Sequence, residues 1–222
     1  FTNKRIEAQS EPHVLDGFFG FAKALGAPVV APTWQMPITD EDQLWASEQL
    51  SGDKPIAVIS AAASKAERNW HREGYAQIAD DLSQRGFTVI LCGGPTTQEI
   101  LLAEEICSFA QSELTNLVGK TSLKQLLAVL KVAHLVIAPD TVGTPVIGLY
   151  AHSNPHRTGP YNYQHYVASC YQDAVQEQYG KVLAKLPWGI RAKGKTLMNG
   201  ITVTQVKDKL TQLIADNYPE LS

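Results

Sequence analysis

The stretch "HLVIAPDTVGTPVIGLY", His134 to Tyr150, decides the fold, because it contains two apolar runs with little chain between them. Residues 135–138 and 145–149 each have the β-branched composition and the Pro and Gly boundaries of a short buried strand. Only residues 140–144 separate the two runs, whereas adjacent parallel strands need a crossover of about a dozen residues or more. Either the pair is a hairpin, or residues are missing between the two strands.

Towards the N-terminus, the sequence alternates between short apolar runs and amphipathic stretches. The apolar runs, which predict strands, lie at 55–61, 87–94, 114–119 and 134–140. The amphipathic stretches predict helices at 73–86, 96–110 and 121–133, the last with Thr121 or Ser122 as its N-cap. This alternation predicts an α/β fold with a doubly wound parallel sheet and right-handed crossovers, so the second strand of the opening stretch should run parallel to the first.

Three further amphipathic segments flank the alternating region. Residues 11–28 carry an apolar helical face that ends at Gly26, and this helix could pack on a core or join two domains. Residues 39–52 predict a short helix that begins with acidic residues and has Thr39 as its cap. Residues 202–218 predict a closing helix, because their apolar side chains recur at helical spacing.

Composition and charge exclude several classes of protein. The chain has 222 residues, of which 44% are hydrophobic and 18% charged, as in ordinary globular proteins. The net charge of −3 provides no general basic surface, so we expect no nucleic-acid partner. Cys92, Cys107 and Cys170 lack CxxC or metal-type spacing, so we interpret them as core thiols in a reducing compartment. No apolar run reaches the roughly 18 residues that cross a bilayer, and no signal peptide is found, so we expect a cytoplasmic or at most peripheral protein.

Ligands of such sheets bind beyond the carboxyl ends of the strands, so the strand-exit loops are the candidate site. The first loop, "SAAASKAERNW", has small residues followed by Lys65 and Arg68, which suits an approaching phosphate, although solvated cations before a helix would look the same. The second loop, "CGGPTTQE", has Gly93 and Gly94, which permit a tight turn or close approach of a ligand. Glu99 could accept hydrogen bonds from ribose hydroxyls, or lie solvated in the first helical turn.

The third and fourth exit loops, "GKTSL" and "PDT", carry weaker signals. The third would ordinarily be only a helix cap. In the fourth, Asp140 suits ligand binding at a strand end or capping of a helix. Carboxylates and histidines do not cluster, so we expect no metal ion. The absence of G-x-G-x-x-G after the first strand disfavours an NAD-dependent oxidoreductase.

Taken in order, "SKAERNW", "ILCGGPTTQE", "LVGKTSLKQLLAVL", "LVIAPDT" and "VGTPVIGLYAHSNPHRTGP" resemble glycosyltransferase family 9, the ADP-heptose:lipopolysaccharide heptosyltransferases. The resemblance is close over residues 55–160 and looser in the flanking helices. Its most specific part is Asp-Thr, then Gly-x-Pro-Val-x-x-Leu, then Asn-Pro-x-Arg-x-Gly-Pro. Family members continue Asp-Ser/Thr with Gly-x-x-His and a short helix, which is absent here. Family pattern and parallel topology together predict that about eight residues or more are missing between Thr141 and Val142, as a phosphate-binding loop rather than a true deletion.

The resemblance implies the GT-B architecture, in which two Rossmann-like domains face each other. This chain would be the C-terminal, donor-binding half. Residues 1–28 would be the tail of the N-terminal domain or an interdomain helix, 29–200 the Rossmann-like donor-nucleotide-binding domain, and 201–222 a C-terminal helix. The acceptor domain, which carries the family's general base, would precede Phe1.

The same resemblance implies a donor site built from the exit loops. Its members would be Ser64, Lys65 and Arg68 at the diphosphate, Glu99 at the ribose, Thr121 and Leu123 at the adenine, and Asp140 and Thr141 at the sugar and phosphate. Gly93 and Gly94 would also bind the donor, and Arg157 would contact the donor or the partner domain.

The activity that the resemblance implies is inverting, metal-independent transfer of heptose, or a related sugar, from an ADP-sugar to the lipopolysaccharide inner core. The ADP-sugar would be a substrate, and no cofactor would be needed. The enzyme would act in the cytoplasm of a Gram-negative bacterium or peripherally at the inner face of the inner membrane. Two alternatives stay open: a sugar-nucleotide 2-epimerase of the same architecture, and a non-enzymatic nucleotide-binding module.

Overall fold

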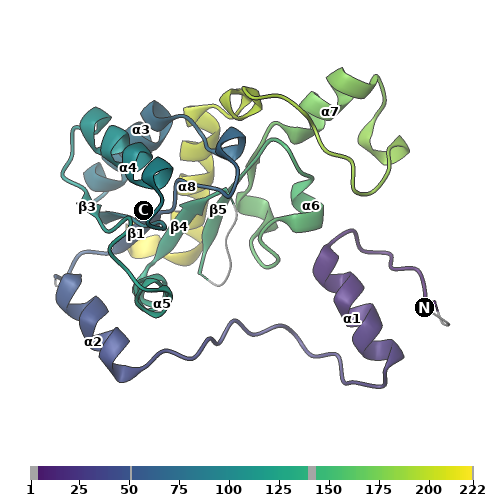
Figure 1. Cartoon of the computed structure of the whole chain (residues 1–222), viewed down its shortest axis with the longest axis horizontal. Coiled ribbons are helices and arrows are strands. Elements are labelled where there is room, and N and C mark those ends of the chain that lie inside the picture. The colour runs from purple at the N-terminus through teal and green to yellow at the C-terminus, as the bar shows by residue number, and fades with distance from the viewer. Residues whose placement is uncertain (1–4, 51, 140–143, 222) are drawn as a thin grey trace.

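The computed structural model of the chain describes residues 5–50, 52–139 and 144–221. Within them, a six-stranded sheet has the order β3-β2-β1-β4-β5-β6, and every neighbouring pair is parallel (Figure 1). The strands are β1 (Ile56–Ile59), β2 (Thr88–Leu91), β3 (Thr115–Asn116), β4 (Leu135–Ala138), β5 (Val146–Tyr150) and β6 (Ala168–Ser169). From β1, strands β2 and β3 extend the sheet in one direction, and β4, β5 and β6 extend it in the other. This is the strand order of the Rossmann-like doubly wound sheet, so the expected fold class is confirmed.

Helices cover both faces of the sheet. The α-helices are α1 (Val14–Ala24), α2 (Asp40–Gln49), α3 (Arg72–Gln84), α4 (Thr97–Phe109), α5 (Leu123–Val132), α6 (Pro155–Thr158), α7 (Tyr171–Tyr179) and α8 (Val203–Asn217). Short 3-10 helices are η1 (Ala66–Arg68), η2 (Gln164–Tyr166), η3 (Leu183–Lys185), η4 (Leu197–Gly200) and η5 (Pro219–Leu221). Helices α3, α4 and α8 pack on one face, and α2 and α5 on the other.

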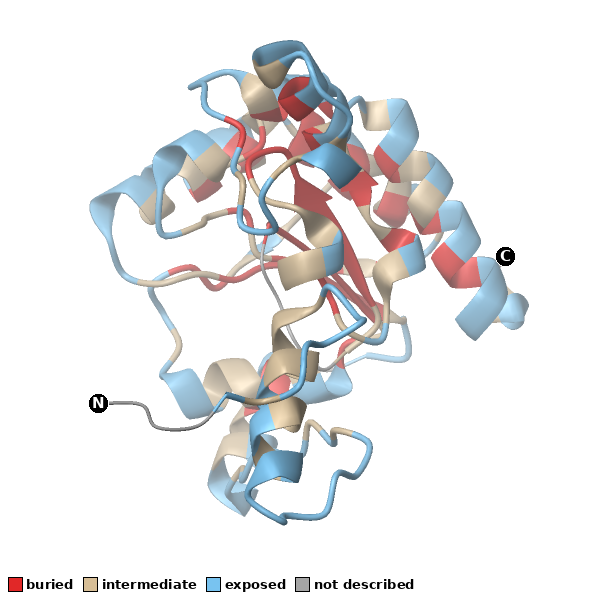
Figure 2. Cartoon of the chain, turned by 90° about the vertical axis from the view of Figure 1, so that its right-hand side faces the viewer, coloured by how far each residue is buried: buried red, intermediate tan, exposed pale blue. Residues whose placement is uncertain are grey.

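Strands β1, β4 and β5 are buried at every position, because helices cover both faces of the sheet there (Figure 2). In β1, Ala57 and Ile59 point into the core under α3, α4 and α8, whereas Ile56 and Val58 point into the core under α2 and α5. This two-sided burial is why strands could be recognised in the sequence as short continuous apolar runs, without polar alternation.

The helix ends follow the capping rules that the sequence suggested. Thr39 caps α2 by accepting a hydrogen bond from the Asp42 amide. Ser122, rather than Thr121, is the cap of α5, and it forms a reciprocal capping box with Gln125. Gly86 has a φ of +88° directly after α3, a left-handed conformation that glycine adopts without strain.

The opening stretch forms two parallel strands, so the hairpin interpretation is excluded. Val136 pairs with Val146 and Ala138 with Gly148 in a parallel register. The break that the sequence predicts after Thr141 lies outside the described residues and stays a prediction.

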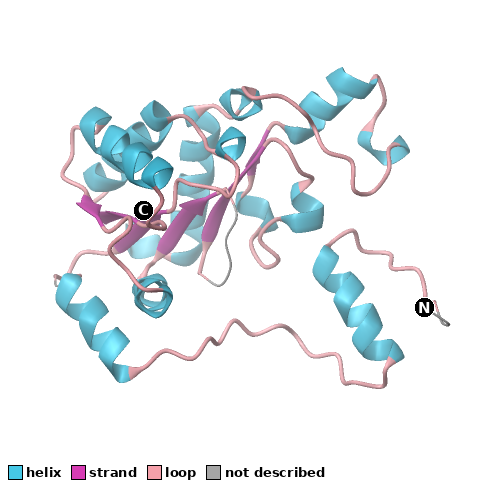
Figure 3. Ribbon diagram, viewed as in Figure 1, coloured by secondary structure: helices cyan, strands magenta, loops and turns pink. Residues whose placement is uncertain are grey.

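Helix α1 differs from the other long helices because it has no buried residue. It lies away from the sheet, beside α6, and an extended segment connects it to α2 along one side of the molecule (Figure 3). Phe18 and Phe21 on this helix, and Leu25 directly after it, are exposed. Among the described residues, no helix combines the length and hydrophobicity that spanning a membrane requires.

Candidate functional site

The strand order reverses between β1 and β4, and the loops at the carboxyl ends of the strands meet near this point. A small pocket is lined by Ala61 and Ala62 from the exit of β1, Gly93 and Glu99 from the exit of β2, and Val118 from the exit of β3. The structure therefore brings together three of the four loops in which sequence signals occurred.

The loop after β1 is held in shape by contacts with the residues that follow it. The Asn69 side-chain carbonyl accepts a hydrogen bond from the Ala63 amide at 2.8 Å, and the Tyr75 hydroxyl donates to the Ala61 carbonyl at 3.2 Å. Burial raises the pKa of Tyr75, so this hydroxyl stays protonated and keeps its role as a donor at neutral pH. Ser64 and Lys65 are exposed, whereas Arg68 ends η1 and is half-buried.

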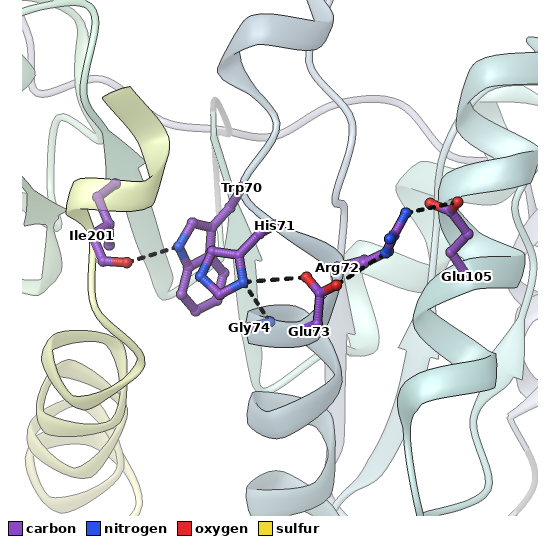
Figure 4. A network of polar contacts seen from close by, with 7 residues as sticks. All are labelled: Trp70, His71, Arg72, Glu73, Gly74, Glu105 and Ile201. Atoms are coloured by element: carbon purple, nitrogen blue, oxygen red, sulfur yellow. Dashed lines mark hydrogen bonds and ion pairs between the residues drawn. The ribbon is translucent and has the colours of Figure 1, made fainter. Parts of the chain in front are cut away.

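Trp70 anchors the end of this loop, and sequence reasoning did not single it out. Its ring is buried, and its Nε1 donates to the Ile201 carbonyl at 2.9 Å (Figure 4). The next residue, His71, caps α3 by accepting from the Gly74 amide at 2.9 Å. Arg72 then bridges to Glu105 on α4 at 2.9 Å. The cationic loop is thus tied to α3, α4 and the segment before α8.

Glu99 folds back onto the glycine turn after β2. Its carboxylate accepts hydrogen bonds from the Gly94 amide at 2.5 Å and from the Thr96 hydroxyl at 3.0 Å. A Cβ atom at Gly93 or Gly94 would lie 3.0 Å from this carboxylate, so the two glycines make room for it. The half-buried carboxylate has further lone pairs with which to accept ligand hydroxyls.

Replacing Glu99 by Ala is expected to lower the free energy of unfolding by about 1–2 kcal/mol, because a charge-assisted hydrogen bond and a favourable charge in the first turn of α4 are lost. Urea denaturation measures the change. Glu104→Ala, at an exposed position on the same helix, is the control and should change stability by less than about 0.5 kcal/mol. If both substitutions lower the free energy of unfolding equally, the hydrogen bond between Glu99 and the Gly94 amide does not contribute to stability.

Two further predicted site residues follow the exit of β3. Thr121 is half-buried before α5, and Leu123, the first residue of α5, is exposed. Asp140 and Thr141 lie outside the described residues. Sequence reasoning missed Lys120, an exposed cation in the loop after β3 whose ammonium donates to the Asn116 carbonyl at 2.8 Å.

Arg157 was expected in a polar turn, but it belongs to the short helix α6, which Asn154 caps and Pro155 begins. The side chain is half-buried and lies over the ring of Trp188, with 4.0 Å between the guanidinium carbon and the ring centroid. A four-residue helix is too short to show a helical pattern in the sequence, and the Asn-Pro pair at its start is itself a turn signal. The sequence therefore did not reveal this helix.

The cysteines and the acidic residues offer no alternative chemistry in the described ranges. Burial raises the pKa of Cys92 to about 12, and it also raises the pKa of Cys107 and of Cys170, so all three thiols stay protonated at neutral pH. All three pack with the hydrophobic core. Residues 5–50, 52–139 and 144–221 contain no group of three His, Cys, Asp or Glu side chains that could hold a metal ion.

Comparison with known proteins identifies the family. The sequence profile of glycosyltransferase family 9 (heptosyltransferase) matches residues 1–186. The chain belongs to glycosyltransferase family 9. The predicted resemblance is therefore confirmed, and it extends beyond the region where the motifs were recognised.

Individual members of glycosyltransferase family 9 are similar over different lengths. The lipopolysaccharide core heptosyltransferase OpsX of Haemophilus influenzae is 40% identical over 221 residues, which is 96% of this chain and 64% of that protein. Lipopolysaccharide heptosyltransferase 3 of Escherichia coli K12 is 31% identical over 102 residues, 42% of this chain and 30% of that protein. This family 9 chain thus spans less than two thirds of the length of both relatives.

Solved structures of the family share the fold. A family 9 glycosyltransferase from Veillonella parvula superposes with a TM-score of 0.72 at 18% identity, covering 96% of this chain and 63% of that chain. The Escherichia coli heptosyltransferase WaaC, solved with ADP, superposes with a TM-score of 0.59 at 17% identity, covering 95% and 60%. At these identities the likeness establishes the fold alone.

Proposed function

We propose that the chain is the donor-binding half of a heptosyltransferase that transfers heptose from ADP-heptose to the inner core of lipopolysaccharide. The observation that carries this proposal is the 40% identity to OpsX over 96% of the chain. The sheet order supports it, because a doubly wound sheet binds nucleotides at the point where its order reverses, and the Lys65–Arg68 loop leaves β1 at that point.

In this proposal the exit loops hold the ADP-sugar. Lys65 and Arg68, with Ser64, bind the diphosphate on a loop that Asn69 and Tyr75 hold in shape. Glu99 uses its free lone pairs for the ribose hydroxyls. The adenine lies against the start of α5, near Thr121 and Leu123, and Asp140 with Thr141 binds the sugar and its phosphate.

The proposed reaction is a single displacement with inversion at the anomeric carbon. The acceptor hydroxyl attacks that carbon while the bond to the leaving ADP breaks, and a general base in the other half of the enzyme takes the hydroxyl proton. Negative charge grows on the departing diphosphate, and Lys65 and Arg68 stabilise it electrostatically. Because these cations supply the compensating charge, the proposal assigns no cofactor and no metal ion to this half.

The domain organisation and the location are part of the same proposal. Helix α1, with exposed Phe18 and Phe21 and with exposed Leu25 directly after it, is proposed to be an interdomain helix or the tail of the N-terminal domain. The length of OpsX, of which this chain spans 64%, leaves room for an acceptor-binding half. We place the enzyme in the cytoplasm, with peripheral contact at the inner membrane where its acceptor lies, and with no nucleic-acid partner.

The test is product analysis with the full-length protein, ADP-heptose and a lipopolysaccharide core acceptor lacking heptose. Mass spectrometry should show the acceptor heavier by one heptose residue, with equimolar ADP released, and a chelator should leave the rate unchanged. NMR of the product should show inverted configuration at the anomeric carbon. Conversion of the donor to an epimer without transfer would support the epimerase instead, and ADP binding without any reaction would support the binding module.

Asp140→Ala should lower kcat roughly 10- to 100-fold, because a charge-assisted contact to the transferring sugar is lost, while the midpoint of thermal unfolding stays the same. Asp173→Ala, at an exposed position on α7, serves as the control with unchanged turnover. If Asp140→Ala keeps the wild-type rate, its role is to cap a helix.

A further inference from the structure

A corner of the molecule beside the exit of β5 joins three segments that are far apart in the sequence. The Trp188 indole N–H donates to the Pro12 carbonyl at 2.7 Å. His13 Nε2 contacts the Gly159 carbonyl at 2.9 Å, and the Tyr161 hydroxyl donates to Asp16 at 2.7 Å. The start of α1 is therefore fastened to the loop around α6 and to the segment after α7, as its place beside α6 in Figure 1 also shows.

Arg157 belongs to this corner through its contact with Trp188, and no hydrogen bond or ion pair joins its guanidinium to the described residues. Its Nε atom is buried and has no hydrogen-bond partner in the described part of the chain. Its side chain forms no ion pair with any described residue, and its guanidinium carbon lies 4.0 Å from the centroid of the Trp188 ring. A buried donor without a partner is costly in a folded protein, and here that donor is Nε alone. The terminal amino groups of the guanidinium are the donors that an anionic ligand can meet.

Trp188 is held in place from two directions. Arg157 covers the face of its ring, and Pro12 accepts its N–H. The side chain is 54% exposed, so hydrophobic burial alone does not determine its position. Stacking on a fixed ring orients the planar guanidinium and leaves its edge free for the paired hydrogen bonds that a phosphate or carboxylate accepts.

From this geometry we infer that Trp188 is a positioning residue, which holds Arg157 ready for an anionic group of a substrate at the β5 side of the crevice. The inference rests on the proposed function, since it assumes that the crevice receives a substrate with phosphate or carboxylate groups. Through the contact of Trp188 with Pro12, the position of Arg157 also depends on the segment that begins α1. The anionic group belongs either to the donor diphosphate or to the acceptor saccharide.

The experiment compares Arg157→Ala, Trp188→Leu, and the double variant in the full-length protein. The donor KM, the acceptor KM and kcat are measured, together with ADP affinity by calorimetry and the midpoint of thermal unfolding. Both single variants should raise the same KM by about tenfold or more, the loss of one charged contact, with a smaller change in kcat. Trp188→Phe, which keeps a stacking face but lacks the N–H, should fall between Trp188→Leu and the wild type. Trp34→Leu, in the extended segment before α2, is the matched control and should behave as the wild type.

The double variant separates positioning from a merely structural role. If Trp188 acts through Arg157, the double variant should be no worse than Arg157→Ala alone. The inference is overturned if the KM of the double variant rises by the product of the two single effects. It is also overturned if Trp188→Leu leaves the KM unchanged, or if the two single variants affect the KM of different substrates. An effect on the donor KM and on ADP affinity assigns the anion to the donor, and an effect on the acceptor KM alone assigns it to the acceptor.

The wild-type measurements keep this inference separate from the proposed function. Turnover and ADP binding by the wild-type protein test the function, whereas only the comparison between the variants tests the role of Trp188. If the wild-type protein shows no turnover, calorimetric affinities for ADP and for the acceptor saccharide replace the KM values, and the inference is overturned if both affinities are unchanged in both single variants.

Discussion

The Trp70→Ala variant is expected to lose about 3–5 kcal/mol of unfolding free energy, the cost of truncating a large buried aromatic side chain. Trp70 is 1% exposed and packs edge-on against Tyr75 with 5.2 Å between ring centroids. Removing the ring leaves a cavity between α3 and the segment before α8, and it leaves the Ile201 carbonyl without its hydrogen-bond donor. Such a loss is a large part of the stability of an ordinary domain.

Denaturation in urea, followed by circular dichroism, measures this change. Trp70→Phe keeps most of the ring but lacks the N–H, so its loss should be smaller, about 1–3 kcal/mol. Trp34→Ala, at a half-buried position of the extended segment before α2, should cost clearly less than Trp70→Ala. If Trp70→Ala is no more costly than Trp34→Ala, Trp70 is not the anchor of the loop after β1.

The Arg68→Ala variant is expected to bind ADP roughly 10- to 150-fold more weakly, corresponding to about 1.5–3 kcal/mol for a charge-assisted phosphate contact. Arg68 ends η1 in the loop after β1, beside the point where the sheet order reverses. The same cation is proposed to stabilise the leaving diphosphate, so kcat should fall as well. Arg68→Lys should recover part of the affinity, because it keeps the charge but not the paired geometry of a guanidinium.

Calorimetric titration of ADP into the full-length protein measures the affinity. The matched control is Arg85→Ala, because Arg85 follows the last residue of α3, at the opposite end of the helix from η1, and pairs with Asp81 at 2.8 Å. The Arg85→Ala variant should bind ADP as tightly as the wild type. Unchanged ADP affinity in Arg68→Ala would remove Arg68 from the site and leave Lys65 and Lys120 as the candidates for the phosphate contact.

The sequence by itself determined the parallel sheet from β1 to β5 and the long helices around it, because its signals are local, whereas it did not reveal α6, β6 or α7. Residues 56–59 and 135–138 are buried on both faces of the sheet, so each strand is visible as an unbroken apolar run. Caps such as Thr39 act within one helical turn and can be read from neighbouring residues. The order of these elements was sufficient to predict a doubly wound sheet, and hence the loops in which to look for Lys65, Arg68 and Glu99.

Only the tertiary structure decided which side chains hold those loops, because the partners are distant in the chain. Trp70 meets the Ile201 carbonyl, and Trp188 meets the carbonyl of Pro12. In both pairs the acceptor is a backbone carbonyl, which every residue possesses, so no residue type in the sequence indicates it. The path of the chain brings donor and acceptor together, and that path depends on how all the elements pack, whereas local periodicity records only whether each residue is buried.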